Sequence, residues 1–370
     1  MLTPYIDKFE IILSNQCNLQ CKYCFVHQEK KVMSLEDVHA ACDFINNYPH
    51  KSRDCMVALF GGETLLHFEL VQECIKLLSK ELHVVIYTNA ILLDESKLNW
   101  LLQFPNISYN FSLDGDRYAH NLSRVYHDGR GSFDDVVKSL QTYSNFYRTP
   151  IERVCCKSVI YPSNIMGIMS TMQNIETVPC KLSYCLARDP GVWKMEDMSL
   201  YEEQFNTLAN YYIKNFDRIQ NKMDLFIWQV ELMTCSREYS CDAARCAQLT
   251  IAPDLNLYPC SYFVSNDKES ILGTVDSGII NVDLCNKLKT SFMPDIEECK
   301  NCELYKNRSC LGQCIGAVSA YTHGERFDVV IPEFCEIMKI LRKISLRVHK
   351  ELFSNPKYLK SISAYKRNEK

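Results

Sequence analysis

The chain has 370 residues, of which 47% are hydrophobic and 23% are charged. This length predicts about two domains with a sizeable core, and the composition is that of an ordinary globular protein. The formal net charge of −4 argues against a general nucleic-acid binder, which would be strongly basic. No apolar run approaches the ~20 residues that span a bilayer, and no signal peptide precedes the first predicted strand. We therefore expect a cytoplasmic protein.

The first half of the chain alternates short β-branched runs with amphipathic helical segments. Strands are expected at Phe9–Leu13, Met56–Phe60, Val84–Tyr87, Ile107–Leu113, Val154–Ile160 and Lys181–Cys185. Helices are expected at Leu35–Asn47 after a capping box of Ser34 and Asp37, at Phe68–Leu82, Glu95–Gln103 and Phe133–Phe146, and shortly after Ser163. The alternation predicts an α/β fold with about six βα units and a parallel sheet.

The pattern changes after Asp189-Pro190-Gly191. Two helices are expected at Leu200–Asn221 and Leu225–Met233, then short strands and turns between Cys235 and Cys335, then a helix at Pro332–Leu352. The basic stretch Lys357–Lys370 is expected to be a solvated tail. We divide the chain into a barrel domain at 1–190, a helical linker at 191–237, a cysteine-rich domain at 238–335 and a C-terminal helix with its tail at 336–370.

Polar or glycine-rich motifs follow four of the predicted strands. They are the cysteine loop CNLQCKYC, Gly61-Gly62-Glu63, Tyr87-Thr88-Asn89 and Ser112-Leu113-Asp114-Gly115. In parallel α/β sheets, active sites form at the carboxyl ends of the strands. We therefore expect these motifs to share one rim of the sheet.

The sequence contains 20 cysteines, and such a number in a cytoplasmic protein points to metal binding or redox chemistry rather than to a disulfide framework. Cys17, Cys21 and Cys24 have the spacing C-x3-C-x2-C. Three thiolates this close can hold three irons of a cubane cluster and leave the fourth iron open. The alternative is a zinc site, but structural zinc takes four ligands, usually in paired C-x2-C knuckles, and no second knuckle lies nearby.

The cysteine loop and the strand-end motifs resemble those of the radical S-adenosylmethionine (SAM) enzymes. The resemblance implies a partial (β/α)6 barrel in which the open iron binds the amino and carboxylate groups of SAM. Electron transfer from the cluster cleaves SAM, and the 5′-deoxyadenosyl radical takes a hydrogen atom from the substrate. Cofactor contacts are then expected from Tyr23, Gly61, Gly62, Glu63, Asn89, Ser112 and Arg124.

Within that resemblance, the glycine–glycine–glutamate motif would serve the SAM amino group, and Thr64 replaces the proline that usually follows it. Ser112 and Arg124 would contact the SAM carboxylate, with Arg130 as a competitor for Arg124. Asn89 and Asn164 would line the site, although asparagines are also common in turns.

The C-terminal cysteines resemble the SPASM extension that follows the barrel in many peptide-modifying radical SAM enzymes. Cys241, Cys246, Cys260 and Cys314 would then hold one auxiliary [4Fe–4S] cluster, and Cys299, Cys302, Cys310 and Cys335 a second. Paired structural zinc ions are the alternative, and Cys235 competes for a place in the first set. The glycine expected five residues before Cys260 is Leu255, and Asn256 is the candidate for the left-handed backbone that glycine would supply. The spacer between Cys302 and Cys310 is seven residues instead of the usual five.

Most other cysteines are expected to be inert core residues. They are Cys42, Cys55, Cys74, Cys155, Cys156, Cys180, Cys185 and Cys285. Cys185, at the end of a predicted strand, is the candidate to reach the cavity as a hydrogen donor.

The resemblance implies a maturase of a ribosomally made peptide, which forms a thioether or carbon–carbon crosslink with three [4Fe–4S] clusters and SAM. Its partners would be a peptide or protein substrate, an electron donor such as flavodoxin or ferredoxin, and a separate leader-recognition protein, because the chain shows no room for a leader-binding domain. Sulfatase maturases of this class carry an aspartate after the cysteine that matches Cys260, whereas this chain has Ser261. Formylglycine formation is therefore an alternative, as are peptide epimerisation and a non-catalytic zinc or electron-carrier protein.

Overall fold

The computed structural model describes residues 4–49, 51–146, 153–176, 180–189, 191–227, 241–264, 268–291, 297–306, 310 and 312–367. Cys235 lies outside the described residues, and so does most of the helix predicted at Leu225–Met233.

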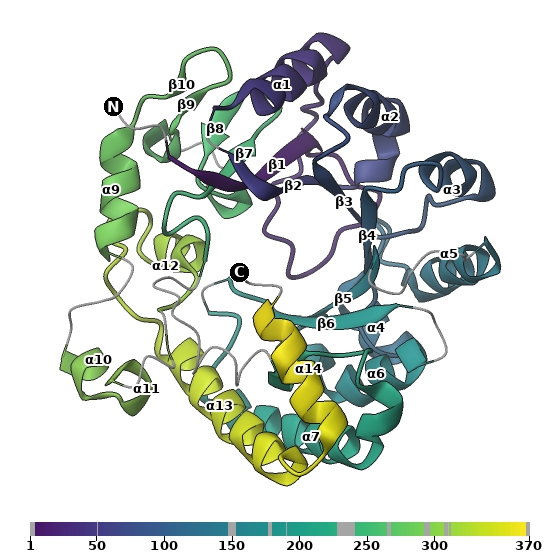
Figure 1. The fold of residues 1–370 in the computed structure, drawn as a ribbon, viewed down its shortest axis with the longest axis vertical. Coiled ribbons are helices and arrows are strands. Elements are labelled where there is room, and N and C mark those ends of the chain that lie inside the picture. Colours follow the sequence, from purple (N-terminus) through teal and green to yellow (C-terminus); the bar gives the residue numbers. More distant parts are fainter. Residues whose placement is uncertain are drawn as a thin grey trace.

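Six parallel strands form the first part of a single sheet, as the alternating pattern predicted. They are β1 (Ile6–Ser14), β2 (Lys51–Gly61), β3 (His83–Thr88), β4 (Ile107–Ser112), β5 (Val154–Ile160) and β6 (Lys181–Leu186). The strands lie in sequence order, and each neighbouring pair is parallel. Figure 1 shows them in an arc with helices along its outer side. The α/β prediction and the partial barrel are therefore confirmed.

Helices follow these strands on the outside of the arc. They are α1 (Leu35–Asn47), α2 (Phe68–Leu77), α3 (Glu95–Leu101), α4 (Arg117–Ser123), α5 (Phe133–Phe146) and α6 (Ile168–Glu176). Helix α1 begins at the predicted capping box, in which the Asp37 amide donates to Ser34 Oγ at 3.1 Å and the Ser34 amide donates to Asp37 Oδ2 at 2.8 Å. Helix α4 was not predicted, because its seven residues are too few for a clear apolar period.

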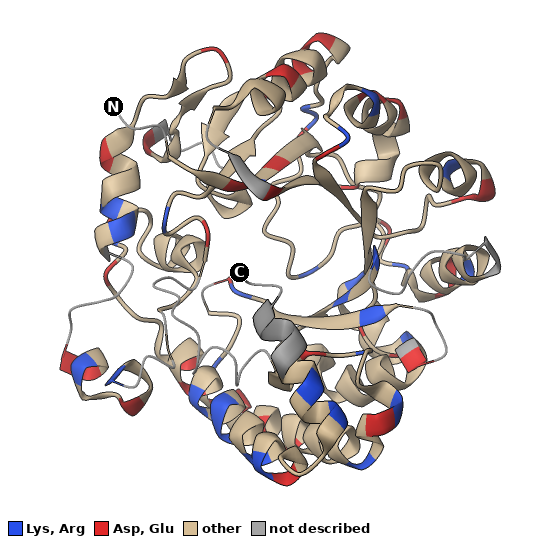
Figure 2. Cartoon of the chain, in the orientation of Figure 1, with Lys and Arg blue, Asp and Glu red and all other residues tan. Residues whose placement is uncertain are grey.

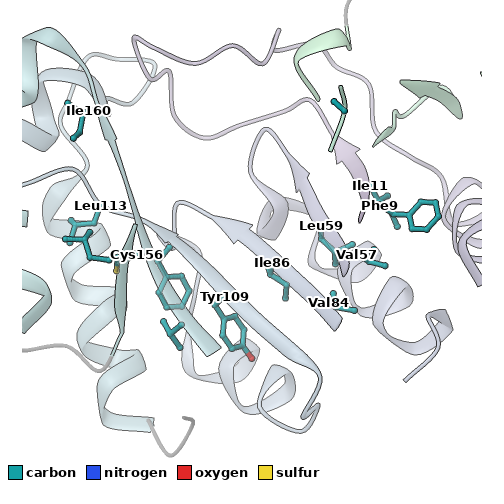
Figure 3. Close-up of a cluster of buried hydrophobic side chains, with 14 of the residues drawn as sticks. Phe9, Ile11, Val57, Leu59, Val84, Ile86, Tyr109, Leu113, Cys156 and Ile160 are labelled. Atoms are coloured by element: carbon teal, nitrogen blue, oxygen red, sulfur yellow. The ribbon is translucent and has the colours of Figure 1, made fainter. Parts of the chain in front are cut away.

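The two faces of the curved sheet differ in burial. Its outer face packs against the helices through a continuous apolar layer (Figure 3). That layer includes Phe9, Ile11, Val57, Leu59, Val84, Ile86, Tyr109, Leu113, Cys156 and Ile160. On β5, buried residues alternate with half-buried ones, so solvent reaches the inner face. Side chains that act on a ligand are therefore expected on the inner face and at the rim.

The sheet continues from the barrel into the cysteine-rich region. Strand β7 (Gln248–Ile251) pairs in parallel with β1, and β8 (Asn256–Tyr258), β9 (Gly273–Thr274) and β10 (Gly278–Ile279) extend the sheet as antiparallel strands. The C-terminal region therefore begins as an extension of the barrel sheet.

The remaining helices surround the open side of the arc. They are α7 (Met198–Ile219), α9 (Val282–Ser291), α10 (Glu297–Asn301), α11 (Glu303–Lys306), α12 (Ile315–Tyr321), α13 (Pro332–Leu352) and α14 (Pro356–Arg367). Helix α13 packs along α7, where Lys343 pairs with Glu202 at 2.8 Å. No helix of the described residues is both long enough and apolar enough to span a membrane.

The predicted solvated tail is wrong for most of its length, because residues 356–367 form helix α14. Tyr358 is fully buried, and its ring meets that of Phe216 at 5.4 Å between centroids. Figure 2 shows Lys and Arg on α14 and along the neighbouring α13. The basic residues therefore belong to a docked amphipathic helix, whose charge masked its apolar face in the sequence.

Candidate active site and cysteine clusters

Cys17, Cys21 and Cys24 lie in the loop that leaves the carboxyl end of β1. Burial raises the pKa of the Cys17 thiol to about 12 and that of the Cys21 thiol to about 11. Cys17 and Cys21 are nevertheless partly accessible, and Cys24 is exposed. Such thiols ionise readily only when a positive charge such as a metal ion is supplied, so the loop suits a cluster.

The glycine–glycine–glutamate segment at the end of β2 holds the beginning of this loop. The Gly62 amide donates to Ser14 O at 2.9 Å, and the Glu63 amide donates to Gln16 O at 2.8 Å. A Cβ atom at position 62 would lie 2.0 Å from Gln16 O. Glycine is therefore required here for the close approach of two backbones directly before Cys17.

The Glu63 side chain is buried and fixes the end of β3. Its carboxylate accepts hydrogen bonds from Thr88 Oγ1 at 2.6 Å and from the Asn89 amide at 2.7 Å. Asn89 Nδ2 in turn donates to Asn18 Oδ1 at 2.7 Å, next to Cys17. Both predicted site residues thus connect the strand end to the cysteine loop.

A second network fixes the middle of the cysteine loop. The Tyr23 hydroxyl donates to the buried carboxylate of Asp114, which also accepts from Arg124 Nε at 2.8 Å and from the Val159 amide at 2.8 Å. The Arg124 guanidinium also lies near Cys21, where its charge lowers the pKa of the thiol against the effect of burial. The guanidinium of Arg124, predicted to contact the carboxylate of SAM, thus pairs in this structure with a carboxylate of the protein.

The other candidates near the rim differ in their surroundings. The competitor Arg130 is exposed and pairs with Asp135 at 3.0 Å. Asn164 Oδ1 accepts from the Tyr161 amide, and its Nδ2 donates to Val159 O, which is a turn role. Ser112 is half-buried at the end of β4.

Sequence reasoning missed Lys157, which lies on β5 beside Ser112 in the parallel register. Its Nζ donates to Ser183 Oγ on β6 at 3.0 Å. The only sequence feature that could have indicated Lys157 is its position in β5. Its neighbours Cys156 and Ser158 are buried on the opposite face of the strand, so Lys157 points inward. A lysine at an inward position of a parallel strand is unusual, since such strands are mostly apolar.

Three cysteines of the first C-terminal set lie together. Burial raises the pKa of Cys260 well above its ordinary value, and the neighbouring thiols of Cys314 and Cys241 raise it further. Arg188, just beyond the end of β6, lies near Cys314, whose charge raises the pKa of the guanidinium. The three thiols therefore lie at the mouth of the barrel beside a guanidinium.

The structure contradicts the prediction that Cys246 is a cluster ligand. Cys246 forms a disulfide with Cys285 of α9, and both residues are buried. Cys246 ends the turn that begins at Cys241, and its φ of 54° directs the chain into β7. The expectation that Cys285 is an inert free thiol is wrong for the same reason.

The second C-terminal set comes together in full. Electrostatic interactions connect Cys299 with Cys302 and Cys310, and connect Cys335 with Cys310 and Cys299. Gln313 Nε2 donates to Cys335 Sγ at 3.1 Å and to Ile331 O at 2.9 Å, which ties the start of α13 to the cysteine loop. Four thiols of this kind are the ligand set of a cubane cluster.

Accessibility separates the predicted ligands from the other thiols. Apart from Cys246, every predicted ligand is half-buried or exposed. Five of the free cysteines expected to be inert are buried, namely Cys42, Cys55, Cys74, Cys156 and Cys180, whereas Cys155 and Cys185 are half-buried on the inner face. Among the described residues, no three His, Cys, Asp or Glu side chains surround a single metal-ion position. A cubane cluster takes one thiolate per iron, so its ligands need not converge on one point.

An aromatic contact joins the two cysteine regions. The ring of Phe25, directly after Cys24, stacks on that of Tyr262 with centroids 3.9 Å apart. Tyr262 lies two residues after Cys260, and a Cβ at Gly316 would lie 2.5 Å from Tyr262 Cβ. The position of Tyr262 is thus fixed between the first cysteine loop and the C-terminal set.

The left-handed residue in the turn before β8 is Leu255 and not the predicted Asn256. Leu255 has a φ of 60°, whereas Asn256 is already part of β8. The Leu255 amide donates to Ala252 O at 2.9 Å, and its carbonyl accepts from the Val275 amide at 2.9 Å. The strand register therefore imposes the conformation at the position that the motif gives to glycine.

Comparison with known proteins agrees with this geometry. The radical SAM superfamily model matches residues 11–161. The cysteine-type anaerobic sulfatase-maturating enzyme of Clostridium perfringens is 24% identical, over 81% of this chain and 86% of that enzyme. The radical SAM cyclopropyl synthase TigE of Paramaledivibacter caminithermalis is 22% identical, over 94% of this chain and 75% of that enzyme. Native anSMEcpe, solved with bound AdoMet (SAM) and the Cp18Cys peptide, has the same fold, with a TM-score of 0.71 at 19% identity over 98% of this chain and 100% of that chain.

Proposed function

We propose that this chain is a radical SAM enzyme that matures a peptide by radical chemistry, because the radical SAM superfamily model matches residues 11–161. The observation that carries the proposal is the group of Cys17, Cys21 and Cys24 at the carboxyl end of β1, within the matched region. These accessible thiols, next to a tight glycine cradle, fit a [4Fe–4S] cluster with one open iron. When bound, such a cluster and SAM supply a radical that abstracts a hydrogen atom from the substrate.

The residues around the loop position these groups. Gly61 and Gly62 let the end of β2 approach the backbone before Cys17, and Glu63 and Asn89 hold β3 against the same loop. Asp114 holds Tyr23 and Arg124, whose guanidinium lies near Cys21. Ser112 remains as a hydroxyl donor for a carboxylate at the end of β4.

We further propose that the C-terminal cysteines form a SPASM-type region with two auxiliary clusters. Cys241, Cys260 and Cys314 would hold the first, without Cys246, which the disulfide removes. Cys299, Cys302, Cys310 and Cys335 would hold the second. The grouping of the thiols and their partial accessibility support this assignment.

The reaction we propose is crosslinking of the peptide through a thioether or carbon–carbon bond. Loss of a hydrogen atom leaves a carbon radical, and closure of the new bond releases one proton and one electron. An auxiliary cluster would accept that electron, and the stacked Phe25 and Tyr262 lie beside both cysteine regions. The similarity to a cyclopropyl synthase supports bond formation at carbon. A flavodoxin or ferredoxin would supply electrons, and a separate protein would recognise the leader of the peptide.

Formylglycine formation is the second candidate, and the similarity to a sulfatase-maturating enzyme favours it. Against it, Ser261 offers no carboxylate after Cys260. The Ser261 amide donates instead to the carboxylate of Glu10 at 3.2 Å, but that carboxylate is paired with Lys8 at 2.6 Å. A paired carboxylate is a poor base, so we rank crosslinking first.

The test is co-expression of this chain, in an anaerobic bacterial host, with each short open reading frame that neighbours its gene. Crosslinking predicts that one peptide loses two hydrogen atoms, gains no reactivity towards hydrazides and gives fused fragments in tandem mass spectrometry. A hydrazide-reactive product would establish formylglycine instead. A product of unchanged mass that contains a D-residue would contradict the crosslink and establish epimerisation.

A further inference from the structure

A row of three polar side chains crosses the inner face of the barrel at the carboxyl ends of β4, β5 and β6. Ser112 is paired with Lys157 in the register of β4 and β5, and Lys157 is paired with Ser183 in that of β5 and β6. All three are half-buried, while the residues that alternate with them on β5 are buried among the outer helices. The row therefore places an ammonium between two hydroxyls on a surface that solvent can enter.

Lys157 differs from the other cations of this region in its partners. Lys8 is neutralised by Glu10 at 2.6 Å, and Arg124 by Asp114 at 2.8 Å. Among the described residues, no carboxylate lies within 4.0 Å of Lys157 Nζ, whose hydrogen-bond acceptor is the neutral Ser183 hydroxyl. An ammonium has three donors, so two remain for a ligand.

The charge of Lys157 is retained in this environment. Burial alone would lower the pKa of its ammonium, but the nearby thiols of Cys185 and Cys155, the phenol of Tyr87 and the carboxylate of Asp224 raise it overall. Asp224 acts only at a distance, and a half-buried ammonium without an anion in direct contact is costly unless a ligand completes it. The two flanking hydroxyls add neutral donors that a carboxylate accepts well.

We propose that Ser112, Lys157 and Ser183 form a carboxylate-binding site on the inner face of the barrel, with Lys157 as its cation. The proposal rests on the proposed function, because the carboxylate has two chemical sources there. One is an acidic side chain of the peptide substrate, and the other is the carboxylate of SAM, for which the cation Arg124 is already paired with Asp114.

The test compares Lys157→Met with Lys157→Arg and with the matched control Lys181→Met. Lys181 is also half-buried and lies on β6, paired with Cys155, but it has no flanking pair of hydroxyls in this row. All proteins are reconstituted anaerobically, and equal iron content and equal circular dichroism establish that they fold alike. Binding of SAM is measured by calorimetry. Binding of peptides is measured as the retention of an equimolar pool of hexapeptides with one glutamate each, compared with the same peptides carrying glutamine in its place.

A loss of SAM affinity of about 10- to 100-fold in Lys157→Met, as expected for a lost hydrogen bond between charged groups, would assign the site to SAM. In that case Lys157→Arg should restore part of the affinity, and decarboxylated SAM should bind the wild type and Lys157→Met equally. Unchanged SAM affinity with a glutamate preference that Lys157→Met abolishes would assign the site to the substrate.

The proposal is overturned if SAM affinity is unchanged and the glutamate preference is either absent or survives in Lys157→Met. Failure of the proposed function is a separate result. In that case the wild type binds neither iron nor SAM, whereas the comparison of glutamate and glutamine peptides still tests the carboxylate-binding site.

Discussion

At the scale of single residues, the chemistry of each side chain depends on the partner it already has. Arg124 and Lys157 are both cations near the rim, but the first pairs with Asp114 and the second has only a neutral acceptor. The sequence shows the residue types and not these pairings. Residue-by-residue transfer from a motif therefore gave no sign that Arg124 pairs with Asp114, and it overlooked Lys157.

The same dependence on partners separates Cys246 from Cys241. Cys285→Ser should leave the iron content of the reconstituted protein unchanged, because Cys285 is bonded to Cys246 and to no proposed ligand. Cys241→Ser should lower it by up to about four iron atoms per chain, the content of one cubane cluster. Iron and sulfide analysis measures both. If Cys246→Ser lowered the iron content as much as Cys241→Ser does, Cys246 would be a ligand after all.

Leu255 supplies a second prediction at this scale, because its φ of 60° is unfavourable for any residue with a Cβ. Leu255→Gly and Leu255→Ala remove nearly the same side chain, but only glycine relieves the backbone. Leu255→Gly should be more stable than Leu255→Ala by about 1 kcal/mol. Thermal denaturation of the two variants side by side gives the ranking, and equal stabilities would contradict it.

At the scale of strands and helices, the sequence predicted the elements that have a clear period and missed those that do not. The bounds of β5 and of helices α1, α5 and α13 were predicted to the residue, since their apolar periods and caps are strong. Helix α4 is too short, and the apolar side of α14 is narrow and surrounded by lysines. The sequence predicted β5 as a strand. It did not show which side chains of β5 face the inside of the barrel, because that depends on how the sheet curves.

The end of β2 offers a test of how an element positions the cluster. Gly62→Ala should reduce the iron bound by about four atoms per chain and abolish SAM cleavage, because the new Cβ would displace the backbone before Cys17. Gly191→Ala is the matched control, since Gly191 has a φ of 77° but a Cβ atom added there would meet nothing within 4 Å. Normal iron and cleavage in Gly62→Ala would show that the loop tolerates the displacement.

The ion pair of Lys8 and Glu10 on β1 is expected to stabilise the pairing of β1 with β7. Glu10 also accepts from Thr250 Oγ1 at 2.7 Å, and its side chain is 7% exposed. Lys8→Met should destabilise the protein by about 3–5 kcal/mol at neutral pH, because it leaves a buried carboxylate without its cation. The double variant Lys8→Met/Glu10→Leu should be less destabilised than Lys8→Met, and denaturant unfolding under anaerobic conditions measures the difference.

The pKa shifts give the sign of the pH dependence for this pair. Burial would raise the pKa of Glu10, but Lys8 and the hydrogen bonds lower it below the ordinary 4.5. The contribution of Glu10 to stability is therefore present above about pH 4.5 and is lost as the pH falls through the lower folded value. The pKa of Lys8 is raised, so its contribution is present below about pH 10.5 and is lost at higher pH. The double variant should lose both dependences, and retention of either would contradict this account.

At the scale of the whole molecule, one sheet connects the radical SAM domain to the cysteine-rich region. Pairing of β7 with β1 carries Cys260 to the mouth of the barrel, where Tyr262 meets Phe25 beside the first cysteine loop. The spacing of the cysteines predicted three ligand sets, and the disulfide with Cys285 removes Cys246 from one of them. The disulfide could not be predicted, because it depends on the contact of α9 with the turn before β7.

The decisive measurement asks whether this chain is a radical SAM enzyme with two auxiliary clusters. It combines iron and sulfide analysis of the anaerobically reconstituted chain with an assay of 5′-deoxyadenosine formed from SAM under dithionite. The account predicts about 12 iron atoms per chain with SAM cleavage, and about eight without cleavage when Cys17, Cys21 and Cys24 are all changed to alanine. About four iron atoms with cleavage would leave the first cluster in place and reject the auxiliary clusters. Zinc without iron, and no cleavage of SAM, would contradict the account as a whole.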